Sequence, residues 1–214
     1  TLDALGAGRV VYVMLDATLR DFTVTNRVTA GSGGGVYAAN AVTLIGMNVY
    51  SNSATTTGGG AYVGGVANVA DSIFSANLAD VDGGGLYAVS NLAMTSTQFV
   101  SNTATTNGGG MRANSAATVT GTTFAGNTAA VAGGALFDSP STLTNSRFTG
   151  NWTGAGGAAG GGYFNGDATQ TNVNFQENRS GTTNGGGAVY ANGASLTDVT
   201  FVSNTTTAAG GGAY

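Results

Sequence analysis

Runs of glycine recur along this chain at a nearly constant spacing. The run Gly58-Gly59-Gly60 is followed by Ala61-Tyr62, and seven other positions carry a counterpart. The eight copies of the motif are counted from Gly33, Gly58, Gly83, Gly108, Gly133, Gly160, Gly186 and Gly210. The step is 25 residues through the first five runs, and then 27, 26 and 24. A period in this range is typical of a solenoid, a propeller or another repeat array.

A second landmark follows each glycine run by about 16 residues. It is a bulky apolar residue with Asn three positions later, in the pairs Val49 and Asn52, Phe74 and Asn77, Phe99 and Asn102, Phe124 and Asn127, Phe148 and Asn151, Phe175 and Asn178, and Phe201 and Asn204. Between the landmarks lies a short alternating stretch such as Val42-Thr43-Leu44, which indicates a strand. Each repeat therefore holds three short strands, and no segment has a sustained helical period.

A unit of this size cannot bury its apolar residues alone, so we expect the repeats to stack as coils. Each strand would then pair in parallel with its copy ~4.8 Å away, and equivalent residues would form columns. The sequence predicts an all-β parallel β-helix solenoid of about eight coils of ~25 residues, with three short strands per coil. Residues 1–8 are a lead-in segment, and residues 9–214 form a single repeat domain that we expect to be part of a longer chain.

Three apolar columns should fill the interior of the tube. The first is Val11, Val36, Ala61, Leu86, Met111, Leu136, Tyr163, Val189 and Ala213. The second is Leu19, Leu44, Val69, Met94, Val119, Leu143 and Leu196. The third is Val24, Val49 and the six Phe residues named above. The Asn residues should stack at one corner as a hydrogen-bonded ladder, and the glycines should allow a sharp turn into the first strand.

Side chains next to the first column should point outward, because residues alternate faces along a strand. These residues form a predicted strip of Tyr12, Tyr37, Tyr62, Tyr87, Arg112, Phe137, Phe164 and Tyr190. The strip could bind a glycan or a partner protein, although outward aromatics on a sheet often only stack on one another. Arg112 either stacks between Tyr87 and Phe137 as a cation–π contact or is one exposed polar variant.

Charged residues make up only 7% of the chain, and the net charge is −4. Nucleic acid is an unsuitable partner for such a chain, because phosphate binding needs clustered Lys or Arg. The chain has no His and no Cys, so a transition-metal site is not expected, and no cofactor is implied. No window is apolar enough for a membrane-spanning helix.

The positions of the carboxylates in the repeat do not predict a catalytic pair. Glycoside hydrolysis needs two carboxylates at a set separation, and few of the ten acids fall at the same place on neighbouring coils. No catalytic residue is assigned. The segment Asp80-Val81-Asp82-Gly83 is similar to the start of a calcium loop, which makes Asp80 and Asp82 weak metal candidates, with a solvated turn as the alternative.

The two repeated motifs resemble those of a known family. Gly133-Gly134-Ala135-Leu136 and Gly186-Gly187-Ala188-Val189, together with Phe74-Ser75-Ala76-Asn77 and its counterparts, are similar to the repeats of chlamydial polymorphic membrane proteins. The same motifs occur in the wider class of right-handed β-helix repeat proteins of bacterial surfaces. The resemblance covers residues 9–214 and implies a right-handed helix and an exported, autotransporter-like passenger, often an adhesin.

The leading hypothesis is a non-catalytic structural or adhesive segment at a bacterial cell surface or outside the cell. One alternative is the subunit of a head-to-tail filament, formed by self-association through the terminal coils. Another alternative is a carbohydrate-active lyase or hydrolase. A glycan or a protein of the host or cell surface would be the partner of an adhesin.

Overall fold

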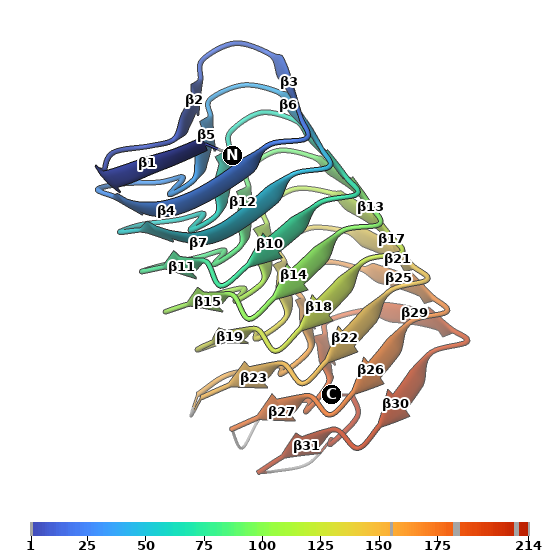
Figure 1. Cartoon of the computed structure of the whole chain (residues 1–214). Helices are drawn as coiled ribbons and strands as arrows, with labels where there is room; N and C mark the ends of the chain where they lie inside the picture. Colours follow the sequence, from blue (N-terminus) through green and yellow to red (C-terminus); the bar gives the residue numbers. More distant parts are fainter. Residues whose placement is uncertain (1, 155, 182–184, 208–209, 214) are drawn as a thin grey trace.

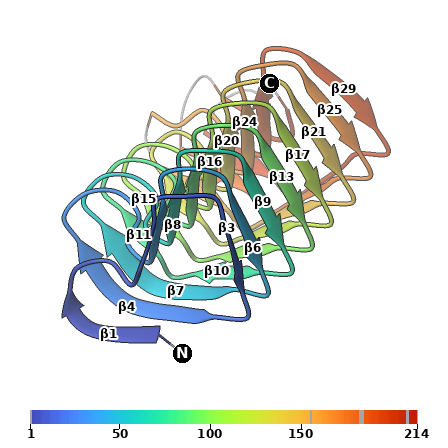
Figure 2. The same cartoon turned by 90° about the horizontal axis from the view of Figure 1, so that it is seen from above.

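The computed structural model of the chain describes residues 2–154, 156–181, 185–207 and 210–213. Thr1 of the lead-in segment and Tyr214 after the last glycine run lie outside the described residues. The strands stack as parallel coils around one interior, from the N-terminal end at the top of Figure 1 to the C-terminal end at the bottom. The coils turn clockwise as they move away from the N-terminal end, so the β-helix is right-handed, as the resemblance implies (Figures 1 and 2).

Two of the walls are eight-stranded sheets, one strand per coil, so the described part of the chain forms eight coils. Sheet B consists of β2 (Val11–Val13), β5 (Val36–Ala38), β8 (Ala61–Val63), β12 (Leu86–Ala88), β16 (Met111–Ala113), β20 (Ala135–Phe137), β24 (Gly162–Phe164) and β28 (Val189–Ala191). Sheet C consists of β3 (Ala17–Arg20), β6 (Val42–Ile45), β9 (Ala67–Ala70), β13 (Leu92–Thr95), β17 (Ala117–Thr120), β21 (Ser141–Thr144), β25 (Ala168–Thr171) and β29 (Ala194–Thr197).

The remaining strands belong to sheet A, which runs along the bend that carries the Asn column. Its longer ladder is β1 (Leu2–Ala7), β4 (Thr23–Thr29), β7 (Asn48–Ala54), β10 (Ile73–Ser75), β14 (Gln98–Val100), β18 (Thr123–Ala125), β22 (Arg147–Thr149), β26 (Asn174–Gln176) and β30 (Thr200–Val202). Its shorter ladder is β11 (Leu78–Ala79), β15 (Thr103–Ala104), β19 (Thr128–Ala129), β23 (Trp152–Thr153), β27 (Arg179–Ser180) and β31 (Thr205–Thr206). These two-residue strands are a fourth element, not predicted from the sequence, in six of the coils, and in the first two coils the same residues belong to the long strands β4 and β7. No helix in the described part of the chain is long and apolar enough to cross a bilayer.

Aromatic rings fill the interior behind sheet A. The column from Val24 to Phe201 is in register on successive strands, and its rings stack in parallel with centroids 4.6–5.4 Å apart. Five of these rings, from Phe74 to Phe175, are fully buried. Leu44, Val69 and Met94 continue the core behind sheet C. The interior is therefore one continuous apolar stack, as the repeat predicts.

The glycine run meets two different steric demands. Gly58 has φ +68°, which only glycine adopts without strain, and it turns the chain into β8. Gly60 has no room for a side chain, since a Cβ there would lie 2.5 Å from the carbonyl oxygen of Gly85 and 3.1 Å from Cγ of Asn77. The last glycine before the strand thus sets how closely the strand approaches the Asn column.

The close approach of the last glycine to the Asn column shows that the predicted register of two coils is wrong. Gly134 and Gly161 occupy the position of Gly60, since a Cβ on either would meet the Asn and Phe of its own coil. The strands that follow begin at Ala135 and Gly162, so Phe137 and Phe164 face the interior and are fully buried. The prediction that these two rings belong to the outward strip is wrong. Leu136 and Tyr163 hold the outward positions instead. Alignment of the repeats on the first glycine of each run places both strands one residue out of register, which is why the prediction fails.

Gln170 interrupts the interior column behind sheet C. It pairs in register with Leu143 on one side and Leu196 on the other, and its side chain is fully buried. Neither its Oε1 nor its Nε2 has a hydrogen-bond partner among the residues that the structure describes. A buried amide without partners destabilises the fold, so this position is a local defect of the core.

Candidate functional site

The outward column of sheet B, here called the sheet B strip, is the surface that the sequence singled out for binding. It consists of Tyr12, Tyr37, Tyr62, Tyr87, Arg112, Leu136, Tyr163 and Tyr190, all in register on adjacent strands. The first four rings stack in parallel with centroids 5.0, 5.0 and 5.7 Å apart. Tyr163 and Tyr190 form a second stack at 4.9 Å.

Stacking leaves few ring faces of the strip open to a ligand. Tyr37 and Tyr62 have a neighbouring ring on each face, and the guanidinium of Arg9 lies 5.3 Å from the centroid of Tyr12 and 4.6 Å from that of Tyr37. Burial raises the pKa of Tyr62 above its usual value, and the neighbouring Tyr37 and Tyr87 add to this shift. Burial also raises the pKa of Tyr163, with contributions from Tyr190 and Asp138. The strip therefore presents mainly ring edges and phenol groups.

Arg112 closes the tyrosine stack with an ion-pair cluster. Its Nη1 donates to Asp82 Oδ2 at 2.5 Å and its Nε donates to Asp138 Oδ2 at 2.8 Å. The guanidinium also lies 5.8 Å from the centroid of Tyr87. Of the two rings that the sequence placed beside Arg112, only Tyr87 is there, since Phe137 faces the interior. Burial lowers the pKa of Arg112, but the hydrogen bond and charge of Asp138, with the charge of Asp82, raise it overall.

The two acids named as weak metal candidates lie in different environments. Asp82 is buried, and its Oδ1 accepts hydrogen bonds from the backbone N–H and the Nδ2 of Asn107 at 3.1 and 2.8 Å. Asp80 is exposed in the preceding turn. Among the described residues no three His, Cys, Asp or Glu side chains lie close enough to hold a metal ion together. The cation that Asp82 contacts is Arg112.

The Asn column forms a ladder along the corner of sheet A. Nδ2 of Asn102 donates to Oδ1 of Asn127 in the next coil and to the carbonyl oxygen of Phe74 in the preceding coil. The same pair of bonds recurs in the coils of Asn52, Asn77, Asn127, Asn151 and Asn178, and Asn204 donates to the carbonyl oxygen of Phe175. These side chains are committed to holding coils together and are not available to a ligand.

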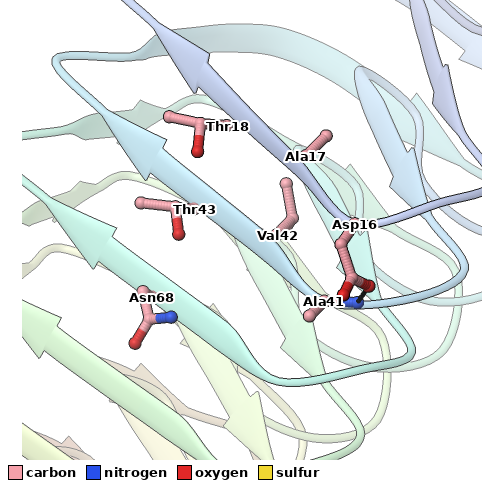
Figure 3. A pocket seen from close by; sticks show the side chains of 7 residues that line it. All are labelled: Asp16, Ala17, Thr18, Ala41, Val42, Thr43 and Asn68. Atoms are coloured by element: carbon pink, nitrogen blue, oxygen red, sulfur yellow. Dashed lines mark hydrogen bonds between the residues drawn. The ribbon is translucent and has the colours of Figure 1, made fainter.

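A shallow hollow on sheet C is a site that the sequence reasoning missed. Its volume is ≈ 280 Å³, and it is lined by Asp16, Ala17, Thr18, Ala41, Val42, Thr43 and Asn68. Thr18, Thr43 and Asn68 are in register on β3, β6 and β9, and Figure 3 shows them one after another across the hollow. Strand alternation could have located them, because each precedes an inward residue: Leu19, Leu44 and Val69.

The rim of the hollow is held by a hydrogen bond between coils. Asp16 Oδ1 accepts from the backbone N–H of Ala41 at 3.2 Å, the bond drawn in Figure 3. The backbone N–H of Ala17 donates to the carbonyl oxygen of Ala41 at 3.1 Å. Within the described residues, the side chains of Thr18, Thr43 and Asn68 make no hydrogen bond. The hollow therefore combines one fixed carboxylate with three unused polar groups.

Comparison with known proteins finds a family model that matches two segments of the chain. Residues 121–139 and 172–192 match the model of the Chlamydia polymorphic membrane protein repeat. Each matched segment runs from a turn after sheet C, through a Phe and Asn of the two columns, to a strand of sheet B. No curated protein and no solved structure matches the chain. The chain is therefore a parallel β-helix repeat protein, and its segments 121–139 and 172–192 are similar to the polymorphic membrane protein repeat.

Proposed function

We propose that the chain is a non-catalytic segment of a bacterial surface protein and serves as a rigid stalk or as the passenger of an adhesin. The observation that supports this most is the continuity of the Asn ladder from Asn52 to Asn204 beside the stacked Phe column. Every coil is thus bonded to the next at the same corner. A tube built this way keeps its length and presents its outer faces in fixed order.

The repeat type supports a location at the cell surface. The matched model is named for membrane proteins of Chlamydia, and a β-helix displayed outside a cell is consistent with that name. The outward side chains of sheet C also support the proposal that the chain is displayed at the cell surface. All of them except Arg20 are uncharged. A surface of small polar groups stays hydrated without attracting charged partners.

Cell labelling tests the proposed location. Antibodies raised against the purified chain should bind intact cells that produce the protein, and protease added outside the cells should remove the signal. Labelling that appears only after the cells are permeabilised would contradict the proposal. Small-angle scattering from the purified chain tests rigidity and should fit a rod rather than a flexible coil.

A second candidate function is the subunit of a head-to-tail filament. Apolar side chains are exposed in the first coil at Met14 and Leu15 and in the last coil at Leu196 and Val202. A second copy stacked there would cover these side chains and pair the terminal strands. Filaments in electron micrographs of the purified chain would favour this candidate, and a monomer at high concentration would argue against it.

A further inference from the structure

We propose that the hollow on sheet C binds a neutral, extended saccharide chain that lies along the axis of the β-helix. This gives the adhesive function a ligand class and a site different from the sheet B strip. The proposal rests on the proposed function for its biological setting. Binding is measured on the purified chain, however, so cell labelling and saccharide binding can fail separately.

The spacing of the polar groups fits a chain of sugar residues. Thr18, Thr43 and Asn68 stand on three consecutive strands in register, so they repeat at ~4.8 Å along the axis. This repeat is comparable to the length of one sugar residue in an extended β-linked chain. Each coil can therefore present one side chain to one sugar residue.

The chemistry of these side chains suits sugar hydroxyl groups. The amide of Asn68 can donate and accept, so it can bind two adjacent hydroxyls, and the hydroxyls of Thr18 and Thr43 can also act both ways. Asp16 is oriented by its hydrogen bond from Ala41, which leaves its Oδ2 to accept from a hydroxyl. Because the three neutral groups have no partner in the described part of the chain, a saccharide would replace only water.

Charge favours a neutral saccharide over an acidic one. Arg20 is the only charged side chain among the outward positions of sheet C, and Asp16 carries a negative charge in the hollow itself. An acidic polysaccharide would need several cations to offset its repeated carboxylates.

The rest of sheet C can extend the contact. The column of Thr18, Thr43 and Asn68 continues, after Ala93, with Thr118, Thr142, Thr169 and Ser195 in register. The side chains of all four are exposed. A longer saccharide that leaves the hollow would meet these groups at the same repeat, and each additional weak contact would raise the overall affinity.

The sheet B strip is a poorer site for the same ligand. Sugars pack on the faces of aromatic rings, and the faces of Tyr37 and Tyr62 are covered by other rings. The next position after Tyr87 is occupied by Arg112, which is already bonded to two carboxylates. Among the described residues, no stacked ring and no ion pair covers the polar side chains of the hollow on sheet C.

Calorimetric titration of the full chain tests the proposal. The probes are the β-linked cellohexaose and N-acetylated chitohexaose, with maltohexaose as the α-linked, non-extended comparison and polygalacturonate as the acidic one. We expect at least one of the β-linked hexasaccharides to bind, and we expect Thr43→Val, Asn68→Ala and Asp16→Asn each to weaken it about three- to tenfold. The matched control Thr103→Val removes an exposed hydroxyl from β15 of sheet A, outside the sheet C column, and should change the affinity by less than about twofold.

Three results would overturn the proposal. One is the absence of heat with both β-linked hexasaccharides at the solubility limit. Another is an equal loss of affinity in Thr43→Val and Thr103→Val, which would remove the hollow from the site. The third is binding of polygalacturonate as tight as that of the neutral chains. All of these variants are at surface positions, and unchanged thermal melting curves verify that each one folds.

Discussion

Gly162 and Phe164 share the interior of one coil, and the ring of Phe164 fills the space that a side chain on residue 162 would need. A Cβ on Gly162 would lie 2.8 Å from Cε2 of Phe164. Several other coils have the opposite arrangement, with a large residue first and a small one third, as in Leu86 with Ala88 and Met111 with Ala113. Sheet B thus keeps a filled interior by exchanging large and small residues within a strand.

This exchange predicts strong coupling between the two positions. Gly162→Val alone should destabilise the chain by about 1–3 kcal/mol through overpacking, and Phe164→Ala alone by about 3–5 kcal/mol through a cavity. The double variant restores the pattern of the other coils and should lose at least about 1 kcal/mol less than the sum of the single losses. Urea unfolding followed by circular dichroism measures all three. The pair Phe164→Ala and Val49→Ala, which lie several coils apart, is the control and should be additive.

The Asn ladder should contribute much more to stability than an exposed Asn. Asn102→Ala removes the donors to Phe74 and Asn127 and the acceptor used by Asn77, all of them buried. We expect a loss of about 3 kcal/mol or more, since the partners left behind are unsatisfied. Asn68→Ala is the matched control on an exposed face and should change the free energy of unfolding by less than about 0.5 kcal/mol. Equal effects in the two variants would contradict the ladder.

Replacement of Gln170 by an apolar residue should stabilise the chain. Gln170→Leu removes two buried polar atoms without partners and continues the column between Leu143 and Leu196. The expected gain in the free energy of unfolding is about 1–3 kcal/mol. Leu143→Gln, which places the same amide one coil away, is the mirror control and should destabilise. A loss of stability in Gln170→Leu would mean that the amide is bonded after all.

Alkaline pH should weaken the folded state through Tyr62. Burial, with the nearby Tyr37 and Tyr87, raises the pKa of Tyr62 above the ordinary tyrosine value of 10.0, so the folded chain holds this proton more tightly than the unfolded chain. The stability linked to this proton is complete below the unfolded pKa and is lost as the pH rises through the folded pKa. Tyr62→Phe should therefore lose less stability than the parent chain above pH 10.0. Urea unfolding at neutral and alkaline pH measures the difference, and identical pH slopes would contradict it.

The period of the sequence predicted most of the fold. Phe74, Phe99 and Phe124 recur every 25 residues, and stacking at that period requires only that equivalent residues lie on neighbouring coils. The hollow on sheet C was also within reach, because Thr18 and Thr43 alternate with core residues. The depth of the hollow could not be predicted, because a pattern of alternation says which way a side chain points but not the shape of the surface around it.

The sequence by itself determined the solenoid, its apolar filling and the corner of Asn, because these follow from which residue types recur at a fixed step. Only the tertiary structure decided the register where the step changes. Gly134 and Gly161 set that register by their contact with Asn and Phe side chains of the same coil, and this placed Phe137 and Phe164 inside and Leu136 and Tyr163 outside. Such contacts join residues that are distant along the chain, so spacing between neighbouring glycines could not reveal them.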